Sequence, residues 1–422
     1  MQKGRISMQK TKLSNGVTIL TEQLPFFKMA HLQIRFTVGS GMEKPEEWGS
    51  AHFLEHLTFA GMNDESGLGF AANMADYGAI FNARTAMDHT LYQFDVPYQN
   101  LIPVLRLFLQ RMTHEAMNAN RVEMERDVIL AELEMVEEDL FEFGLGNFYK
   151  HILQDNYGHP VIGTLESIMG LTPESLQAFR ERYYTPDNLI IGIAGNVAHD
   201  EVVLEIQQVL GQWRGKSDTK CQPVLRETFA PVHVQTESEV VHLLWGLAGP
   251  SRKDRDGSAF AVTMKGLAGD GTDMWARLFH LIRTQLGIAY AVGGEYIYID
   301  EVGLYFFTVV TQPEHVEKIT QLVDQEFNDC QQGLSSLERS RAIATLASAV
   351  YSADDHLPSR VTRMLEQEIY EQPFSTVEEE CALLEQTTEA DVLRVTKRYL
   401  QPRLLMVLGP SMKVAMEEEV GI

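Results

Sequence analysis

Alternating apolar and polar positions near the start of the chain predict the first strands of a sheet. This alternation runs through Leu13–Thr21 and Ala30–Val38, and a Leu-Pro-Phe break at 24–26 separates the two segments. A second pair of strands is predicted over Ile80–Thr85 and Thr90–Val96. Because alternate side chains of a strand point to opposite faces, one face of this sheet is expected to cover a core.

The segments between and after these strands follow a helical period instead. Helices are predicted over Ala51–Phe59, Asn100–Met112 and the long segment Ala119–Phe141. Strands and helices therefore come in blocks and do not alternate strictly. This order is typical of an α+β protein.

A repeated order of residues predicts that the chain consists of two tandem homologous halves. Thr172, Tyr183 and Pro186 are each matched by a residue of the same type 216 positions later, and Gly78 is matched by Gly287 at a displacement of 209. Both copies of the first match read as a helix followed by a buried strand. Each half is therefore expected to be a mainly antiparallel sheet packed with helices.

The boundary between the halves is predicted where the periodicity stops. Gln212 to Lys220 shows no period and is rich in residues that are common in linkers. The predicted division is a first half at 1–212, a linker at 213–225 and a second half at 226–422. A chain of 422 residues is long enough for about two to three domains.

The charge of the chain narrows the classes of partner. Its 35 basic and 59 acidic residues give a formal net charge of -24, which repels nucleic acid and anionic membrane surfaces. An acidic interior would instead attract basic peptides, although surplus acidic residues also serve simply to keep a large protein soluble.

Cysteine usage and hydropathy indicate the compartment. Cys221, Cys330 and Cys381 are far apart and show no C-x-x-C pairing, so neither a disulfide framework nor a thiolate zinc site is expected. The first residues lack the apolar core of a signal peptide, and no stretch reaches the roughly 18 apolar residues of a membrane span. We expect a cytoplasmic protein.

The strongest chemical motif lies in the first predicted helix. His52 and His56 are four residues apart and therefore share one helical face, with Glu55 between them. Two neutral imidazoles suit zinc, and a nearby carboxylate can take a proton from a water that the metal activates. Composition alone would give roughly 0.06 copies of this pattern, so a polar helix face without a metal is the weaker interpretation.

A catalytic zinc needs a third protein ligand, and the predicted helix at 119–141 offers two carboxylates for it. Glu125 and Glu132 are seven residues apart, which returns them to nearly the same helical face after two turns. One of them could bind the metal while the other supports the site.

These motifs resemble the insulinase (pitrilysin) family of zinc peptidases. The resemblance rests on the Gly-x-Ala-His-Phe-Leu-Glu-His-Leu string at 49–57, on Asn-Ala-Arg-Thr at 82–85 and on Glu-Arg-Asp-Val-Ile-Leu at 125–130. The length is similar to the branch that contains the mitochondrial processing peptidase. The family places its third ligand, a Glu, about 76 residues after the second His, so the resemblance implies that Glu132 is the ligand and Glu125 the second carboxylate near the metal.

Two further sets of residues complete the candidate site. The second half has no counterpart of the His motif, but Arg283 and Tyr290 are similar to the family's pair that contacts the substrate carbonyl; without the resemblance, a surface Arg and a half-buried Tyr would be the simpler interpretation. If the strand with Asn82, Ala83 and Arg84 is an edge strand, an extended peptide can pair with its backbone.

The leading hypothesis is therefore a zinc metalloendopeptidase that acts on unfolded peptides or leader segments, with one zinc per chain and Glu55 as the base. The alternative is a non-catalytic or partner-dependent subunit that binds peptides. The resemblance implies that a second chain closes the site, so we expect a homodimer, or a heterodimer with a related chain. The acidic run at 132–142 could be a solvated helix face or line a cavity for basic peptides, and His89 is interpreted as structural.

Overall fold

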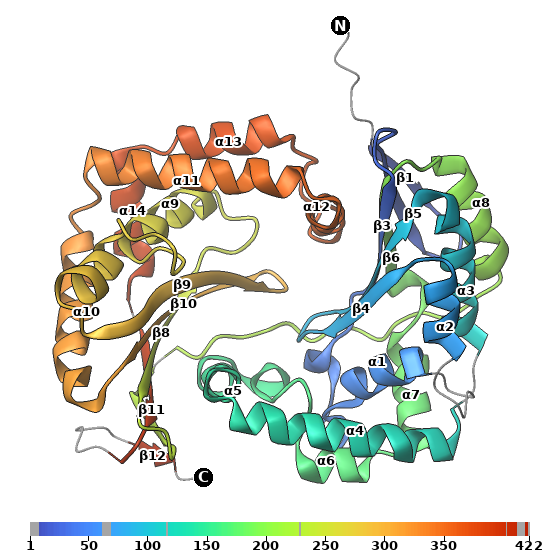
Figure 1. Cartoon of the computed structure of the whole chain (residues 1–422), viewed down its shortest axis with the longest axis horizontal. Coiled ribbons are helices and arrows are strands. Elements are labelled where there is room, and N and C mark those ends of the chain that lie inside the picture. Colours follow the sequence, from blue (N-terminus) through green and yellow to red (C-terminus); the bar gives the residue numbers. More distant parts are fainter. Residues whose placement is uncertain are drawn as a thin grey trace, which may run out of the picture. The chain divides into compact units, whose positions relative to one another are not determined.

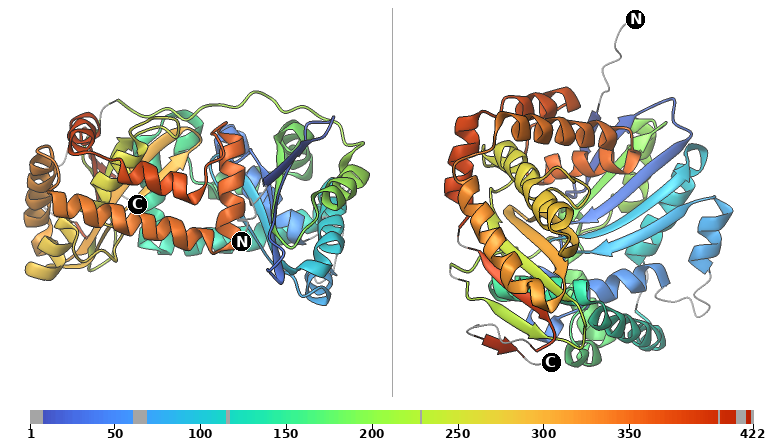
Figure 2. Two further views of the ribbon diagram at one scale, coloured as in Figure 1. Left: turned by 90° about the horizontal axis from the view of Figure 1, so that it is seen from above. Right: turned by 60° about the vertical axis from the view of Figure 1, so that its left-hand side comes forward.

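Two six-stranded sheets organise the chain, and each belongs to its own compact unit. The structure is a computed structural model that describes residues 8–60, 69–114, 117–227, 229–401, 403–411 and 418–420, and Figures 1 and 2 show its helices and strands. The first unit contains Met1–Met135, His159–Gln222 and Ala353–Phe374, and the second contains Val136–Gly158, Pro223–Ser352 and Ser375–Ile422.

Both sheets are mainly antiparallel, as predicted. The first sheet has the order β1 (Met8–Lys12), β2 (Thr18–Gln23), β6 (Leu189–Gly195), β3 (Met29–Phe36), β5 (Thr90–Pro97), β4 (Ile80–Thr85). The second has the order β12 (Glu418–Val420), β7 (Val232–Gln235), β11 (Leu404–Gly409), β8 (Val241–Gly249), β10 (Val302–Thr311), β9 (Ala289–Ile299). Only the pairs β2/β6, β7/β11 and β7/β12 are parallel among the described strands.

The shared strand order confirms the prediction of two homologous halves. From β2 to β4 and from β7 to β9, the strands that correspond in sequence order occupy corresponding places in their sheets. The repeated residues have structural roles: Thr172 and Thr388 each cap the N-terminus of a helix through a capping box. Gly78 and Gly287, with φ of 63° and 64°, each precede an edge strand in a left-handed conformation that favours glycine.

Helices cover the sheets of both units. The first unit contains α1 (Ser50–Ala60), α2 (Gly69–Asp76), α3 (Leu101–His114), most of α4 (Ala119–Glu138), α6 (Leu165–Gly170), α7 (Pro173–Tyr183), α8 (His199–Leu210) and α12 (Leu357–Ile369). The second contains α5 (Leu140–Ile152), α9 (Gly257–Leu267), α10 (Val316–Cys330), most of α11 (Ser336–Asp354), α13 (Val377–Glu385) and α14 (Glu389–Tyr399). In the part of the chain that the structure describes, no helix is long and apolar enough to cross a membrane.

The first predicted strand is wrong in its N-terminal part. Residues 13–17 form the turn of the β1/β2 hairpin, in which Gly16 adopts φ of 109° and donates its N–H to the carbonyl of Leu13 at 3.0 Å. Asn15 and Gly16 are a strong turn signal, and the apolar alternation around them obscured it.

The long predicted helix also divides in two. α4 ends at Glu138, and the side chain of Asp139 accepts hydrogen bonds from the N–H groups of Phe141 and Glu142, which caps the start of α5. Because Asp competes with the helical backbone for hydrogen bonds, it favours a cap at this position over continuation of the helix.

Each sheet is covered in part by a helix that comes from the other half of the sequence. α12, which lies between β10 and β11 of the second half in sequence, packs on β6 and β3 of the first sheet, where Val361 and Leu365 fill the space above Gly192. α5, which precedes the predicted linker, packs on β8 of the second sheet, where Phe148 lies against Gly246. A side chain at either glycine would overlap its partner helix, so both glycines are sites of close helix approach. The predicted division at 213–225 stays a prediction.

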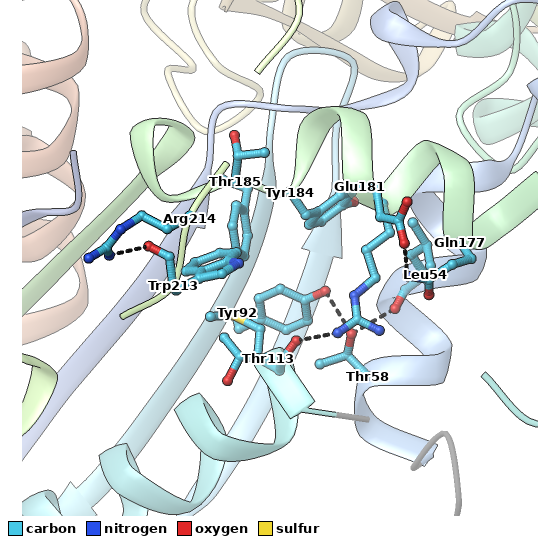
Figure 3. A pocket seen from close by; sticks show the side chains of 13 residues that line it. Leu54, Thr58, Tyr92, Thr113, Gln177, Glu181, Tyr184, Thr185, Trp213 and Arg214 are labelled. Carbon is cyan, nitrogen blue, oxygen red and sulfur yellow. Dashed lines mark hydrogen bonds between the residues drawn. The ribbon is translucent and has the colours of Figure 1, made fainter. Parts of the chain in front are cut away.

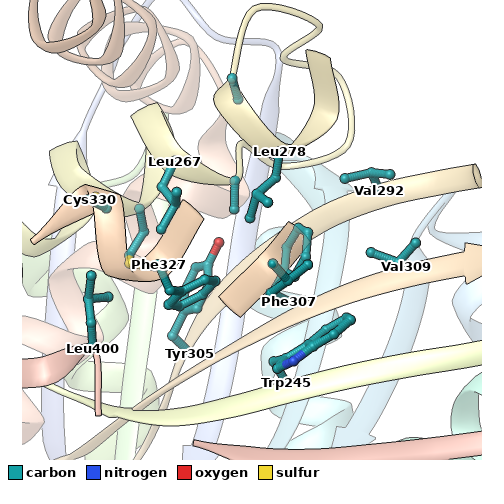
Figure 4. Close-up of a cluster of buried hydrophobic side chains, with 14 of the residues drawn as sticks. Trp245, Leu267, Leu278, Val292, Tyr305, Phe307, Val309, Phe327, Cys330 and Leu400 are labelled. Atoms are coloured by element: carbon teal, nitrogen blue, oxygen red, sulfur yellow. The ribbon is translucent and has the colours of Figure 1, made fainter. Parts of the chain in front are cut away.

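The second unit has its own apolar core between its sheet and helices (Figure 4). Trp245 of β8 and Phe307 of β10 lie 5.6 Å apart between ring centroids, and Phe327 of α10 and Leu267 of α9 are buried in the same cluster. The free thiol of Cys330 is buried in the same cluster, and Cys381 is a second buried free thiol. Cys221 is an exposed free thiol.

Candidate metal centre

The candidate centre is built on α1, whose register puts two imidazoles on one face. His52 and His56 have ring centroids 4.6 Å apart, and both are largely buried. α4 lies beside them and supplies Glu132, whose two carboxylate oxygens lie 3.7 Å from His52 Nε2 and 3.3 Å from His56 Nε2. The structure therefore brings together the three ligands that were predicted from segments about 76 residues apart.

The separations of these donor atoms suit a zinc ion. Four ligand atoms at about 2.0 to 2.1 Å from a tetrahedral metal lie about 3.3 to 3.4 Å from one another. One donor atom each from His52, His56 and Glu132 can be chosen so that all lie within 4.8 Å of one another. Imidazole nitrogens and a carboxylate oxygen also match the ligand set that zinc prefers.

The carboxylates around His56 favour a positive charge at its imidazole. Glu125 lies 3.4 Å from Nδ1 of His56 and is itself paired with Arg121 at 2.6 Å. Burial works to lower the pKa of His56, but hydrogen bonds to Glu125 and Glu132 outweigh it and raise the pKa to about 9. Either a proton or a metal ion can supply this positive charge, and a metal ion must displace the proton in order to bind the imidazole.

His52 has a different environment. Burial and the neighbouring charge of His56 lower its pKa to about 4, so its imidazole is neutral at pH 7 and ready to bind a metal. Its Nδ1 atom is buried without a hydrogen-bond partner among the described residues. Metal-binding histidines usually donate their second N–H to a polar group, so this atom departs from the usual arrangement.

Glu55 lies on the same helix and is held by a residue that the motif did not include. The hydroxyl of Thr85, at the end of β4, donates to Glu55 Oε2 at 2.6 Å. Burial raises the pKa of Glu55, and the hydrogen bond from Thr85 opposes this effect. A carboxylate with a raised pKa is a better proton acceptor than an exposed one. The position of Thr85 directly after the Asn-Ala-Arg segment at 82–84 was the sequence signal that could have indicated this contact.

A second buried pair, which the sequence interpretation missed, fixes the start of α1. The carboxylate of Glu43 accepts hydrogen bonds from the N–H groups of Gly49 at 2.8 Å and Ala51 at 2.7 Å, and His159 Nε2 lies 2.9 Å from it. Both side chains of this pair are almost completely buried, and Trp48 stacks on His159 at 4.7 Å. Glu43 and His159 are 116 positions apart, so no local pattern could have indicated the pair.

The predicted substrate strand is the edge strand β4 of the first sheet. Phe81 packs on Phe59 of α1, with 4.9 Å between ring centroids, so one face of β4 is turned toward the metal helix. Asn82 and Arg84 are exposed and point to the opposite face, and the side chain of Asn82 accepts the backbone N–H of Ala83 at 2.9 Å.

Arg283 and Tyr290 lie in the second unit. Arg283 belongs to the π-helical segment η6 (Phe279–Gln285), where its guanidinium lies 5.1 Å from the ring of Phe279. Tyr290 is on the edge strand β9, is 58% exposed, and its hydroxyl accepts a hydrogen bond from Gln312 at 2.7 Å. Both side chains are near enough to the surface to contact a ligand.

His89 lies in the turn between β4 and β5, and its interpretation as a structural residue stays a prediction. It is buried, with Asp88 Oδ1 at 2.6 Å and the guanidinium of Arg35 at 3.2 Å from Nδ1. Burial lowers its pKa, and the charge of Arg35 adds to this effect.

A pocket of about 370 Å³ lies on the other side of α1 (Figure 3). Leu54 and Thr58 face it because they lie about 200° around the helix from His52 and His56. Tyr92 donates a hydrogen bond to Thr58 at 3.2 Å in its wall. This pocket is separate from the candidate metal centre.

Comparisons with known proteins agree with the fold. Residues 18–165 match the family profile described as "Insulinase (Peptidase family M16)", and residues 170–346 match the profile "Peptidase M16 inactive domain". An uncharacterized zinc protease of Streptomyces coelicolor is 28% identical over 415 residues, which cover 96% of this chain and 90% of the relative. One of Mycobacterium tuberculosis is also 28% identical, with coverage of 96% and 94%.

Solved structures show the same fold. A crystal structure from Pseudomonas fluorescens, described as a peptidase M16 inactive domain, has a TM-score of 0.86 and 19% identity and covers 97% of this chain and 100% of its own. A protease from Helicobacter pylori has a TM-score of 0.86 and 17% identity, with coverage of 96% and 99%.

Proposed function

Because the chain belongs to the insulinase family of peptidases, family M16, we propose that it is a zinc metalloendopeptidase that hydrolyses unfolded peptides or leader segments. The observation that carries the proposal is the convergence of His52, His56 and Glu132 from two helices. A zinc ion bound to them would supply a Lewis acid that activates water and polarises the scissile carbonyl.

Glu55 is the base in this proposal. Its position three residues after His52 points it to the same side of α1, and Thr85 fixes one of its oxygens by a hydrogen bond of 2.6 Å. Burial raises its pKa, so the carboxylate can accept the proton of the attacking water and return it to the leaving amine.

Glu125 is a positioning residue. It lies against Nδ1 of His56 and is paired with Arg121, so it orients the imidazole and favours the tautomer whose Nε2 is free to bind the metal. A carboxylate in this place also makes the imidazole a stronger ligand.

The backbone of β4 is the proposed binding strand for the peptide. Its free edge can add one more strand, which gives affinity with little demand on sequence. The side chain of Asn82 occupies the N–H of Ala83 at 2.9 Å, and a peptide carbonyl would take its place. Arg283 and Tyr290 are proposed as donors to the substrate carbonyl, in line with the family resemblance.

Metal analysis and two isosteric variants test the proposal. We expect about one zinc per chain, retained in Glu55→Gln and lost in Glu132→Gln, and we expect neither variant to cleave a quenched peptide. Glu174→Gln, an exposed position on α7, is the control and should keep both zinc and activity. Cleavage by Glu55→Gln at the wild-type rate would refute the mechanism. Peptide binding with zinc but without turnover in the wild type would favour a non-catalytic peptide-binding subunit.

A further inference from the structure

A second cavity of the first unit lies between its sheet and α12. Its volume is about 560 Å³, which is within the range of roughly 300 to 1,000 Å³ that is typical of ligand pockets. Asn82 and Arg84 of β4 line it together with Leu91 and Gln93 of β5. The opposite wall consists of residues of α12, which include Thr362, Arg363 and Glu366. The candidate substrate strand therefore forms one rim of this cavity.

The wall formed by α12 is firmly attached to the sheet. Arg360 makes a buried ion pair with Glu22 of β2, and both side chains are 7% exposed. The amide of Gln33 on β3 donates to the carbonyl of Pro358 at 3.3 Å and to the hydroxyl of Thr362 at 3.0 Å. A wall that is anchored in this way keeps the shape of the cavity before a ligand arrives, which reduces the entropy lost on binding.

Strand alternation connects the cavity to the candidate metal centre. Thr85 and Phe81 of β4 face α1, where Thr85 binds Glu55, whereas Asn82 and Arg84 face α12. A peptide that pairs with the edge of β4 alternates in the same way. The side chains of this peptide on the Arg84 side would enter the cavity. Its backbone would pass Glu55, because Thr85, the residue after Arg84 on β4, is the one that binds Glu55. The side chain in the cavity would therefore be next to the scissile bond or two residues from it.

The charges of the cavity favour an anionic side chain. Its lining holds two guanidinium groups, Arg84 and Arg363, and one carboxylate, Glu366. Arg363 is paired with Asp354 at 2.6 Å, outside the lining. The guanidinium of Arg84 instead lies 3.5 Å from Nε2 of His89.

His89 does not offset the charge of Arg84. Burial and the charge of Arg35 lower its pKa, which keeps the imidazole neutral at pH 7. The carboxylate beside it, Asp88, is already engaged by the hydroxyl of Tyr370 at 3.0 Å and lies 4.0 Å from Arg35. The lining itself holds two positive groups against one negative group, on a chain whose net charge is -24. Asp354 offsets Arg363, whereas the polar contact of the Arg84 guanidinium among the described residues is the neutral imidazole of His89.

We propose that this cavity is a specificity subsite that binds an acidic side chain of the peptide, with Arg84 as the residue that recognises the carboxylate. The proposal rests on the peptidase function above. It assigns the substrate class as extended peptides with Asp or Glu on the α12 side, near the scissile bond. Such a preference at one position is compatible with basic residues elsewhere in the peptide.

Positional peptide sets test the subsite. Quenched peptides that differ only in Asp, Asn or Lys are compared at the two positions on each side of the cleaved bond, at low and high salt. At one position the wild type should prefer Asp over Asn by about threefold to tenfold in kcat/KM, and salt should reduce this ratio. Arg84→Gln should abolish the preference, Arg84→Lys should keep part of it, and Arg84→Glu should favour Lys. Lys12→Gln, the same charge change on the opposite edge strand β1, should leave the ratio unchanged.

A binding measurement separates failure of the subsite from failure of the peptidase proposal. The Glu55→Gln protein, loaded with zinc, is titrated with the same labelled Asp and Asn peptides, with and without Arg84→Gln. Equal affinities at every position, or a preference that survives Arg84→Gln, would overturn the subsite even if the wild type cleaves peptides. A preference for Asp that depends on Arg84, without any cleavage by the zinc-loaded wild type, would support the subsite and refute the peptidase. Absence of peptide binding would overturn the subsite.

Discussion

The buried pair Glu43 and His159 gives a sharp test of how the metal helix is held. In His159→Ala, the carboxylate of Glu43 would keep its hydrogen bonds from Gly49 and Ala51 but lose the one side chain that contacts it among the described residues. The carboxylate is 0% exposed, so water does not reach it in the folded state. The variant therefore leaves a buried negative charge at the N-terminus of α1.

The expected cost follows from general values for buried pairs. Removal of one partner costs about 3 to 5 kcal/mol because the remaining charge stays buried. Burial raises the pKa of Glu43, so the group can take up a proton, and the two backbone donors remain; both effects favour the lower end, about 3 kcal/mol. For a unit of this size, that loss lowers Tm by roughly 6 to 12 °C.

The assay combines unfolding with metal binding. Urea and thermal unfolding give the loss in stability, and competition with a chelator gives zinc affinity, which should fall because the first turn of α1 positions His52. His199→Ala is the control: His199 also bridges two side chains, Thr11 and Thr21, at 2.8 Å, but it lies on α8. It should lose stability without losing zinc affinity. A loss below about 1 kcal/mol for His159→Ala, or unchanged zinc affinity, would refute the reasoning.

Three further predictions concern packing, pH and assembly. Leu365→Ala should cost the first unit about 2 to 5 kcal/mol and speed hydrogen exchange in β2 and β6, although the residue lies between β10 and β11 of the second half in sequence. Burial works to raise the pKa of Glu338, but Arg277 outweighs it and lowers the pKa to about 2. The stability that this carboxylate contributes is present above its unfolded pKa and is lost as pH falls toward 2. In this pH range, the urea midpoint of Glu338→Gln should therefore depend less on pH than that of the wild type. If Arg283 serves the metal of a partner chain, mixing Glu55→Gln with Arg283→Ala protein should restore about a quarter of wild-type activity, and a monomer or no recovery would contradict the homodimer.

The elements that could be predicted are those whose signal is local. The helix with His52 and His56 and the hairpin β4/β5 lie close to their predicted positions, because periodicity and the i, i+4 spacing are properties of a short segment. The choice between Glu125 and Glu132 could not be made from helical geometry, since both share one face. It came from the family resemblance, and the structure places both carboxylates beside His56.

The features that escaped prediction depend on contacts between distant segments. Glu43 and His159 carry no pattern that distinguishes them from surface residues, and their roles become visible only when the fold buries them together. The hydroxyl of Thr85 on Glu55 is a similar case. The end of α4 was missed for a different reason: one Asp side chain outweighed a helical pattern that continues on both sides of it.

Because α12 comes from the second half of the sequence but packs on the first sheet, substrate choice and metal chemistry can vary separately. The proposed metal donors come from α1 and α4, at residues 52–132, whereas the anchored wall of the proposed subsite for an acidic side chain comes from residues 357–369. Changes at Arg363 or Glu366 could therefore alter which peptides bind while His52, His56 and their hydrogen bonds stay as they are. β4 is the element that both sites share, because its two faces carry Thr85 toward Glu55 and Arg84 toward α12. A bulky substitution in this strand should accordingly affect cleavage rate and selectivity together, whereas one on α12 should affect selectivity alone.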